Sequence, residues 1–386
     1  MDAVVLGTGM IGTTVVRELA SCANISKVTA VDAVQNSVKH CVEAADNAKV
    51  KGRVAALENV EAISEILKEA DVAVACLPHS LSLMTIKAAV SAKCHLVDLV
   101  GSDYHTKMAL DEAAKEAGVV IVPGSGVAPG ITNFLAAQGI DLLDEADEAV
   151  MICGGIPRNP LPPLWYQVVF RLESVMGLYS RPALAVEKGE LVTLPALSGL
   201  ESVRFPDPVG DCEAVITDAH SAAYTLKDKV NRLYEKTVRY KGHWEKMGVL
   251  AELGFLDDTP IDVDGISISP RKFSTAVLEP QMKGQSGEDI TVLRVVTKGK
   301  KNGEQTWFKW EMVDFFDHER GITSMAKTTA MPAMVMAQWI AAGKVTERGV
   351  IPIEKIIIGD HFKPFLSALR ARGIDITFES NRGAAL

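Results

Sequence analysis

The sequence predicts an α/β protein in which an N-terminal, doubly wound parallel sheet is followed by a second α/β domain with a mainly antiparallel sheet. Over the first third of the chain, short apolar segments alternate with helical ones, which is typical of parallel strands buried on both faces. A glycine-rich turn separates the first apolar segment from the first helical one. Farther on, longer strand-like segments are joined by a hairpin signal, which indicates antiparallel pairing.

The first domain is built from short strands that alternate with helices. Such an order requires right-handed crossovers, and these give a sheet with helices on both faces. Its predicted helices include VEAISEILKEA (60–70) and TKMALDEAAKEAG (106–118). Its predicted strands are DAVVLG (2–7), KVTAVD (27–32), GRVAAL (52–57), ADVAVACLP (70–78), CHLVDLVG (94–101) and GVVIVPGSG (118–126).

The second domain begins with the strand-like segment EAVMICGGIP (148–157) and a proline-rich passage, RNPLPPLWYQ (158–167). An Asn302-Gly303 pair lies between two longer strand-like segments and is a strong hairpin signal. This pattern favours an antiparallel sheet with helices. The predicted strands of this part are ISISP (266–270), DITVLRVVTKG (289–299) and QTWFKWEMVDFF (305–316).

The glycine-rich turn has the spacing GxGxxG at the point where a strand ends and a helix begins. There the first glycine permits a tight turn, the second lets backbone approach a pyrophosphate, and the third lets helix and strand pack closely. The helix N-terminus offers free N–H groups and partial positive charge to phosphates. The sequence therefore predicts a Rossmann-type, dinucleotide-binding domain whose cofactor loop is Gly7, Thr8, Gly9, Met10, Ile11 and Gly12.

We expect this dinucleotide-binding domain to occupy residues 1–130 and to be completed by a returning segment, 326–365. That segment contains a predicted helix from about residue 327 to 342, in which Pro332 is tolerable only near the first turn. Residues 131–325 then form the second domain, which we expect to bind substrate and to support oligomerisation.

Asp32 ends the second predicted strand, about 20 residues beyond the glycines, where a carboxylate can accept hydrogen bonds from the adenosine ribose. The same negative charge would repel a 2′-phosphate, and no Lys or Arg follows until Lys39. The predicted cofactor is therefore NAD rather than NADP.

Ligands of such folds bind beyond the carboxyl ends of the strands. At that edge we expect Leu77 and Pro78 to contact the ribose side of the cofactor, and Gly101 and Gly126 to allow close approach of nicotinamide and substrate. The general base is left open among candidates chosen by position alone. Those candidates are Asp98, His79, Asp218 and His220.

Composition excludes several classes of function. The 386 residues suggest two domains, and a net charge of −9 argues against binding to nucleic acid or an anionic membrane. No apolar segment reaches the ~20 residues of a membrane helix. The six cysteines form no CxxC pair, and no HExxH-like spacing predicts a metal site. We therefore expect a cytoplasmic protein with reduced thiols and no metal.

Four segments in order along the chain resemble the saccharopine dehydrogenase family, and within it the NAD-dependent L-lysine 6-dehydrogenases. The resemblance runs from residue 1 to about 355 and implies a homo-oligomer (dimer or tetramer) that oxidises a carbon bearing an amine. Its motifs are GVAPGITN (126–133), CGGIP…PLPPLWYQVVF (153–170), KTVRYKGHWEK (236–246) and MAKTTAMPAMVMAQWIAAGKVTERGVIPIE (325–354).

Departures within these motifs bear on the branch. Saccharopine dehydrogenases that release glutamate carry an aspartate where this chain has Ala128, which favours the lysine enzymes. Arg171, and the segment ITDAHSA (216–222), depart from the lysine enzymes instead. The class of reaction is therefore better determined than the substrate.

The resemblance also implies a substrate site in YEKTVRYKGHWEK (234–246), which we expect to be a turn. It places Arg239 facing the substrate, where a guanidinium can bind a carboxylate through two hydrogen bonds. His243 and Tyr240 would orient the bound amino acid, and Tyr166 is a further candidate for the pocket. The alternative for Tyr240 is a place in the core.

The expected function is NAD-dependent oxidative deamination of the ε-amine of L-lysine, or a closely related amino acid, to the semialdehyde with release of ammonia. The alternative is a saccharopine-type dehydrogenase acting on a secondary amine between two amino acid units. It requires more cationic residues around the pocket, which Arg171 could begin to supply. A third hypothesis is a cofactor-binding regulatory protein without catalytic activity.

Overall fold

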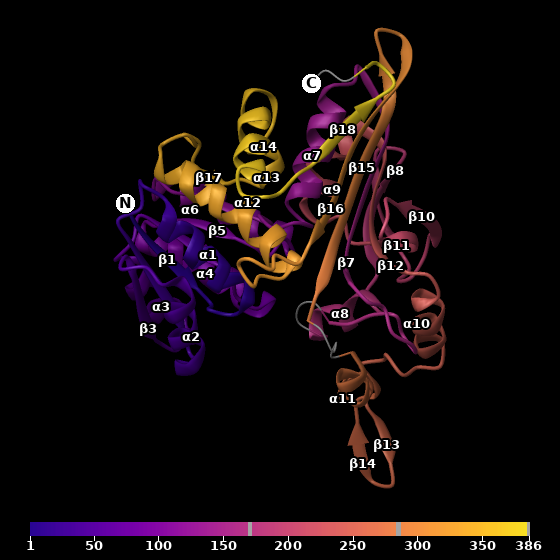
Figure 1. Ribbon diagram of the computed structural model, residues 1–386, viewed down its shortest axis with the longest axis horizontal. Helices are drawn as coiled ribbons and strands as arrows, with labels where there is room; N and C mark the ends of the chain where they lie inside the picture. Colours follow the sequence, from indigo (N-terminus) through magenta and orange to yellow (C-terminus); the bar gives the residue numbers. More distant parts are fainter. Residues whose placement is uncertain (169–171, 283–286, 384–386) are drawn as a thin grey trace. The chain divides into compact units, whose positions relative to one another are not determined.

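The computed structural model describes residues 1–168, 172–282 and 287–383, and these form two compact units (Figure 1). The N-terminal unit comprises Met1–Gln138 and Ala326–Asp375, and the C-terminal unit comprises Gly139–Met325 and the residues from Ile376 onward. Both segments of the N-terminal unit therefore run farther than residues 130 and 365, the predicted ends. The final strand of the chain belongs to the C-terminal unit, which the sequence did not predict.

The N-terminal unit contains a seven-stranded parallel sheet of order β17-β6-β5-β4-β1-β2-β3. The order reverses between β1 and β4, so the loops after these two strands leave in diverging directions and expose the sheet edge between them. The strands are β1 (Asp2–Leu6), β2 (Lys27–Asp32), β3 (Val50–Val54), β4 (Val72–Ala75), β5 (His95–Asp98), β6 (Val120–Pro123) and β17 (Gly349–Val350).

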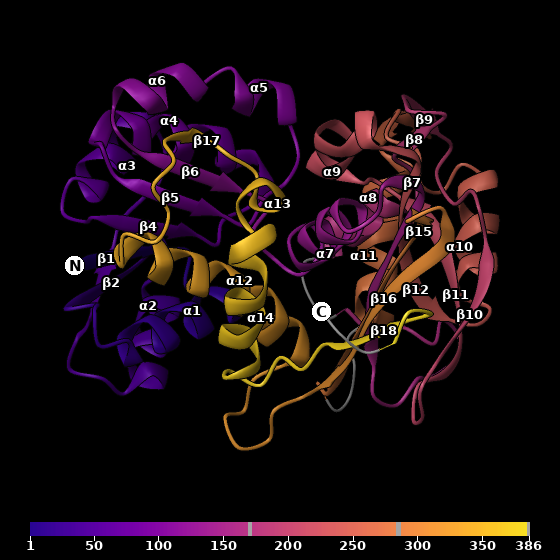
Figure 2. The same ribbon diagram turned by 90° about the horizontal axis from the view of Figure 1, so that it is seen from above.

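Helices cover both faces of this sheet, which confirms the doubly wound prediction (Figure 2). One face of the sheet packs against three helices through the fully buried side chains of Ile63, Ile86 and Ala114. The helices are α1 (Met10–Ser21), α2 (Gln35–Ala45), α3 (Val60–Leu67), α4 (Ser82–Ala92), α5 (Tyr104–Met108), α6 (Asp111–Glu116), α7 (Ile131–Asp141), α12 (Ser324–Ala341), α13 (Ile353–Ile356) and α14 (Phe362–Arg370), with the short 3₁₀ turns η1 (His79–Leu81) and η3 (Gly359–His361).

The C-terminal unit is built on a nine-stranded sheet in which β7 lies between β12 and β15. β7 pairs in parallel with β12, and all the other pairs of this sheet are antiparallel, which confirms the predicted second α/β domain. Its strands are β7 (Glu145–Pro157), β8 (Ala183–Glu187), β9 (Glu190–Leu194), β10 (Glu201–Phe205), β11 (Gly210–Thr217), β12 (Val230–Tyr240), β15 (Asp289–Lys301), β16 (Glu304–Phe315) and β18 (Thr377–Ser380).

The two-residue turn between β15 and β16 consists of Asn302 and Gly303, with φ angles of 53° and 78°. These positive angles are those of a type I′ hairpin, which confirms the hairpin prediction. The hairpin is long and prominent in Figure 1, with β18 along its outer strand.

Helices and a small hairpin surround the C-terminal sheet. The helices are α8 (Leu172–Leu178), α9 (His220–Leu226), α10 (His243–Glu252) and α11 (Pro270–Met282), with η2 (Lys227–Lys229) between α9 and β12. Strands β13 (Ile261–Val263) and β14 (Ile266–Ile268) pair only with each other and, with α11, form an arm that Figure 1 shows at one end of this unit.

Two predictions about local structure are wrong. Pro332 lies well inside α12 rather than in its first turn. Its neighbours Met331, Ala333 and Met334 are fully buried, so tertiary packing offsets the lost backbone hydrogen bond. The segment 234–246 is not a turn, because it forms the end of β12 and the start of α10.

Candidate functional site

The glycine loop after β1 has the geometry that the sequence predicts. Gly7 has a φ of +91°, and a Cβ atom there would lie 2.4 Å from the carbonyl oxygen of Cys76. A Cβ atom on Gly12 would lie 1.8 Å from the carbonyl oxygen of Gly7, so α1 can approach the loop only with glycine at this position. Thr8 is buried and Ile11 is partly buried between them.

Gly9 differs from the other two glycines, because a Cβ atom there would meet nothing within 4 Å. Gly9 precedes α1 and provides no side-chain cap for its first turn, and Met10 beside it is half-exposed. No side chain of the cap residue therefore competes with an anion at this turn, and the helix dipole favours negative charge there. This arrangement fits the pyrophosphate of a dinucleotide.

Asp32 lies at the end of β2, next to this loop. Its Oδ2 accepts hydrogen bonds from the Thr8 N–H (2.8 Å) and the Thr8 hydroxyl (3.2 Å), and its Oδ1 accepts one from the Val34 N–H (2.9 Å). The carboxylate is thereby fixed beside the loop while it stays partly exposed. A fixed carboxylate in this position can bind ribose hydroxyls.

Four predicted contacts lie along the carboxyl edge of the sheet. Leu77 and Pro78 follow β4 and are partly exposed. Gly101 and Gly126 are buried instead, and a Cβ atom on Gly101 would lie 2.3 Å from Cγ of Pro129. The absence of a side chain at Gly101 thus lets the 123–130 loop pack against the loop after β5. Both glycines therefore act through loop packing rather than through an exposed surface.

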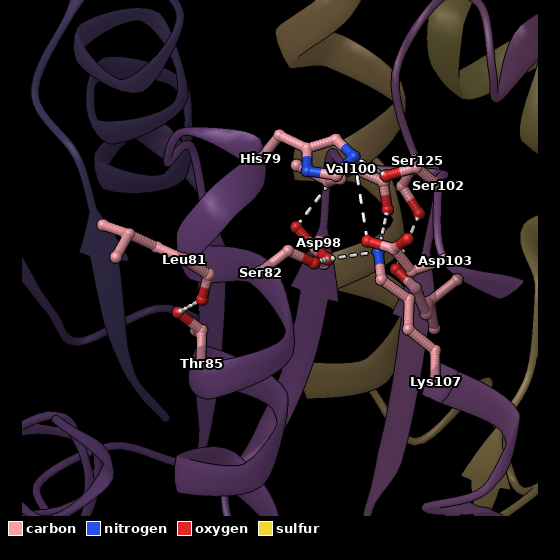
Figure 3. Close-up of polar contacts among 11 residues, drawn as sticks. His79, Leu81, Ser82, Thr85, Asp98, Val100, Ser102, Asp103, Lys107 and Ser125 are labelled. Carbon is pink, nitrogen blue, oxygen red and sulfur yellow. Dashed lines mark hydrogen bonds and ion pairs between the residues drawn. The ribbon is translucent and has the colours of Figure 1, made fainter. Parts of the chain in front are cut away.

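Asp98, a candidate base, belongs to a buried ion pair (Figure 3). Lys107 Nζ lies 3.1 Å from Asp98 Oδ2, and the two side chains are 2% and 1% exposed. The Ser82 hydroxyl and the Val100 N–H also donate to the carboxylate, and Lys107 donates to the carbonyl oxygen of Val100. These bonds connect β5, α4 and α5, so they indicate that Asp98 supports the loop after β5.

His79 lies at the same edge of the sheet as Asp98, but its side chain is half-exposed (Figure 3). Its Nε2 is hydrogen-bonded to the Ser102 hydroxyl and lies 3.7 Å from Asp103 Oδ2. An imidazole with a carboxylate neighbour and access to water is able to exchange protons.

The other two base candidates are neighbours in the C-terminal unit. Asp218 follows β11, and its carboxylate accepts a hydrogen bond from the His220 N–H (3.0 Å). His220 Nδ1 lies 3.5 Å from Asp218 Oδ2, and the two side chains are 25% and 44% exposed. The structure therefore brings Asp218 and His220 together.

Arg239 is 1% exposed at the end of β12. Its Nη1 donates to the carbonyl oxygens of Val238 (2.7 Å) and Gly155 (3.4 Å), and its guanidinium lies over the ring of Tyr166 at 4.3 Å. Among the described residues, no acceptor lies within reach of its Nε and no carboxylate pairs with it. Arg239 is thus a buried cation without an anion.

His243 and Tyr166 surround Arg239, but Tyr240 points elsewhere. His243 is bonded to the Tyr179 hydroxyl and the Leu164 carbonyl oxygen, and its ring packs on Tyr166. Burial, together with the positive charge of Arg239, lowers the pKa of His243 to about 3, so the imidazole is neutral at pH 7. The Tyr240 hydroxyl donates to the Pro157 carbonyl oxygen, and burial raises the pKa of Tyr240 to about 12.

Sequence reasoning missed two buried charged residues, Lys107 and Glu235. Nothing around Lys107 in sequence distinguishes it from a surface lysine of a helix. Glu235 had a signal, because it stands four residues before Arg239 and a strand would place both on one face. The predicted turn concealed this relationship, because residues of a turn do not alternate between two faces. Arg171 lies outside the described residues.

In the part of the chain that the structure describes, no group of three or more His, Cys, Asp or Glu side chains is arranged to hold a metal ion. Nor does any helix among residues 1–168, 172–282 and 287–383 combine the length and the apolar composition needed to cross a membrane.

Comparison with known families matches both parts of the chain. Residues 3–122 match the model of the saccharopine dehydrogenase NADP binding domain. Residues 126–374 match that of the saccharopine dehydrogenase C-terminal domain. These two matches extend over most of the sequence. Neither of them is specific to the lysine 6-dehydrogenases.

Individual relatives are distant. The mitochondrial alpha-aminoadipic semialdehyde synthase of Bos taurus is 22% identical over 397 residues, which cover 83% of this chain and 42% of that protein. The saccharopine dehydrogenase [NADP(+), L-glutamate-forming] of Schizosaccharomyces pombe is 25% identical over 252 residues, 62% of this chain and 52% of that protein. The chain thus spans about half the length of these curated relatives or less.

A solved structure covers the whole fold. The apo saccharopine dehydrogenase (L-Glu forming) from Saccharomyces cerevisiae superposes with a TM-score of 0.82 at 18% identity, over 98% of this chain and 99% of that one. The two chains share one fold.

Proposed function

Because the chain belongs to the saccharopine dehydrogenase family, we propose that it is an NAD-dependent dehydrogenase that oxidatively deaminates the ε-amine of L-lysine or a closely related amino acid. The products would be the semialdehyde and ammonia. The observation that carries this proposal is Arg239, a buried guanidinium without an anionic partner among the described residues. A buried, unpaired charge is costly, and the carboxylate of an amino acid would compensate it.

Two features favour lysine over saccharopine. Ala128 takes the place of the aspartate that the resemblance implies for enzymes that release glutamate. In the C-terminal unit, Arg204, Arg232 and Arg294 all pair with carboxylates, so these three guanidinium groups are already compensated within the protein. Saccharopine carries more carboxylates than lysine and would need further cations.

The saccharopine-type reaction remains the alternative function. It is favoured by the names of the curated relatives, among them the saccharopine dehydrogenase of Schizosaccharomyces pombe.

Bound NAD would supply the acceptor for a hydride from the carbon that bears the terminal amine. The first turn of α1 would hold the pyrophosphate, and Asp32 would bind the ribose hydroxyls. Arg239 would fix the α-carboxylate and so orient the side chain. Water would add to the substrate imine, with His79 or the Asp218–His220 pair as proton-exchanging groups open to solvent.

A panel of amino acids with NAD and NADP, followed at the absorbance of the reduced cofactor, tests this function. We expect turnover of lysine without 2-oxoglutarate, with release of ammonia and a cyclic imine as product. Turnover of saccharopine with release of glutamate, and none of lysine, would assign the chain to the alternative reaction. Cofactor binding without turnover of any amine would indicate a regulatory protein instead.

Cofactor preference provides a second prediction. We expect higher kcat/KM with NAD, and Asp32→Ser combined with Ala33→Arg should shift the NAD-to-NADP ratio by roughly 100-fold or more, because it replaces repulsion of the 2′-phosphate by attraction. Asp32→Asn is the matched control, since it keeps an acceptor for Thr8 while removing the charge. A wild-type enzyme with higher kcat/KM for NADP would contradict our interpretation of Asp32.

We also propose that the protein works in the cytoplasm as a homo-oligomer. All six cysteines are free thiols, which fits a reducing compartment. The arm exposes apolar side chains that a second copy could cover, including Ile261, Ile266 and Phe273 at 53%, 63% and 54% exposure.

A further inference from the structure

Glu235 is a buried acid in the middle of β12. It is 5% exposed, and its backbone pairs with Thr217 of β11 and Met151 of β7. Its Oε2 has no hydrogen-bond partner among the described residues. Burial, and then the negative charge of Asp218, raise the pKa of Glu235 well above 4.5. A buried carboxyl oxygen without a partner costs free energy that a ligand can recover.

Glu235 and Arg239 lie on the same face of the sheet, because successive side chains of a strand alternate between faces. Thr237 stands between them, and Cys153 of β7 is the register partner of Thr237. Burial raises the pKa of the Cys153 thiol, which Glu235 raises further and Arg239 lowers, so both groups act on the thiol between them.

The two unpaired groups do not satisfy each other. Four residues of strand separate their Cα atoms by about 13 Å, and no ion pair joins them among the described contacts. An occupant with a carboxylate at one end and an amine at the other would compensate both. An amino acid whose second amine lies at the end of its side chain has this charge pattern, whereas an α-amino group alone sits beside its own carboxylate.

We propose that the Glu235 carboxyl binds the terminal amine of the amino acid whose carboxylate Arg239 binds, and takes a proton from that amine. This inference rests on the proposed function and adds to it the group that recognises the reacting nitrogen. The proton moves from the ammonium nitrogen to Oε2, so that an ammonium and a carboxylate become a neutral amine and a carboxylic acid. Only a neutral amine can lose hydride from the adjoining carbon.

Two other titratable groups, Asp218 and Cys153, lie near Glu235. Asp218 follows Thr217, the register partner of Glu235 on β11, and its carboxylate is hydrogen-bonded to the His220 N–H. Cys153 lies across the adjoining pair of strands. Asp218 disfavours the ionised form of Glu235, and this makes the carboxyl a better proton acceptor for an ammonium.

Binding of two matched ligands tests the proposal. Lysine and norleucine differ only in the terminal amine, and their Kd values are measured by calorimetry on the protein with NADH, which cannot accept a hydride from lysine. We expect lysine to bind about tenfold to a hundredfold more tightly than norleucine. Glu235→Gln should abolish this ratio and leave the Kd of norleucine unchanged. A ratio that survives in Glu235→Gln, or is missing in the wild type, would overturn the proposal.

Glu187→Gln serves as the matched control, because Glu187 is an acid of the same unit whose Oε1 accepts a hydrogen bond from Tyr234. It should keep the lysine-to-norleucine ratio of the wild type. Loss of the ratio in Glu187→Gln as well would show a general effect of acid removal and would contradict a specific role of Glu235.

Thermal unfolding as a function of pH keeps the proposal testable if turnover is absent. The folded protein retains on Glu235 a proton that the unfolded chain releases, so stability should fall as pH rises from 4.5 toward the raised pKa. Glu235→Gln should lack this part of the fall, with Asp218 and Cys153 unchanged. Identical profiles would exclude a proton-accepting carboxyl. A lysine-to-norleucine ratio that depends on Glu235 without lysine oxidation would refute the proposed function and retain the amine site.

Discussion

Arg239→Ala should lower kcat/KM for the amino acid substrate by roughly 30-fold to several thousand-fold. Removing one member of a desolvated, charge-assisted pair costs about 2–5 kcal/mol, because the substrate carboxylate is left without its partner. The affinity for NAD, measured without amino acid, should not change, since the glycine loop and Asp32 belong to the other unit. Steady-state kinetics and cofactor titration measure the two effects separately.

Two variants distinguish loss of carboxylate binding by Arg239 from simple loss of packing. Arg239→Lys should restore only part of the activity, because an ammonium cannot form the planar pair of hydrogen bonds. Arg294→Ala removes an arginine that also lies over an aromatic ring, Phe205, but has its own partner in Glu311. It should affect stability and not kcat/KM. Wild-type kinetics in Arg239→Ala, with only a lowered Tm, would make Arg239 a core residue.

Lys107→Met should destabilise the protein by about 3–5 kcal/mol, because it leaves the Asp98 carboxylate buried without a counter-charge. The ion pair of Lys107 and Asp98 is almost completely buried, and it connects the end of β5 with α5. Urea unfolding of the N-terminal unit, followed by loss of NAD binding, measures the effect.

The double variant Lys107→Met, Asp98→Asn should lose less stability than Lys107→Met alone, since no charge then remains unpaired. The amide oxygen can still accept from the Val100 N–H, and the amide NH2 group can donate to the Ser82 hydroxyl oxygen. Lys39→Met, which removes an exposed lysine 3.8 Å from Glu43, should have little effect. Equal losses in Lys107→Met and Lys39→Met would contradict the structural role of the buried pair.

The N-terminal unit could be predicted because its signals are local. Gly12 of the loop is required by a contact with a near neighbour, because its Cβ atom would lie 1.8 Å from the Gly7 carbonyl oxygen, and Asp32 ends the next strand. The Asn302-Gly303 turn is equally local. In such places a short stretch of sequence determines the backbone by itself, so pattern and structure agree.

Tertiary context explains what the sequence did not reveal. The segment 234–246 carries charged and aromatic residues, which suggested a turn, yet its first part, with Arg239, belongs to an inner strand between β11 and β7, and Trp244 belongs to α10. Lys107 is buried because it forms an ion pair with Asp98, which lies nine residues earlier at the end of β5. Neither fact follows from local propensity, which tertiary contacts override.

The fate of the hydrogen on the carbon that bears the terminal amine tests the central claim most directly. Lysine carrying two deuterium atoms on that carbon is incubated with the protein and NAD, without 2-oxoglutarate. We expect deuterium in the reduced cofactor, one ammonia for each reduced cofactor and a slower reaction than with unlabelled lysine. Reduced cofactor without deuterium, or reduction that requires saccharopine and releases glutamate, would contradict deamination at the ε-carbon.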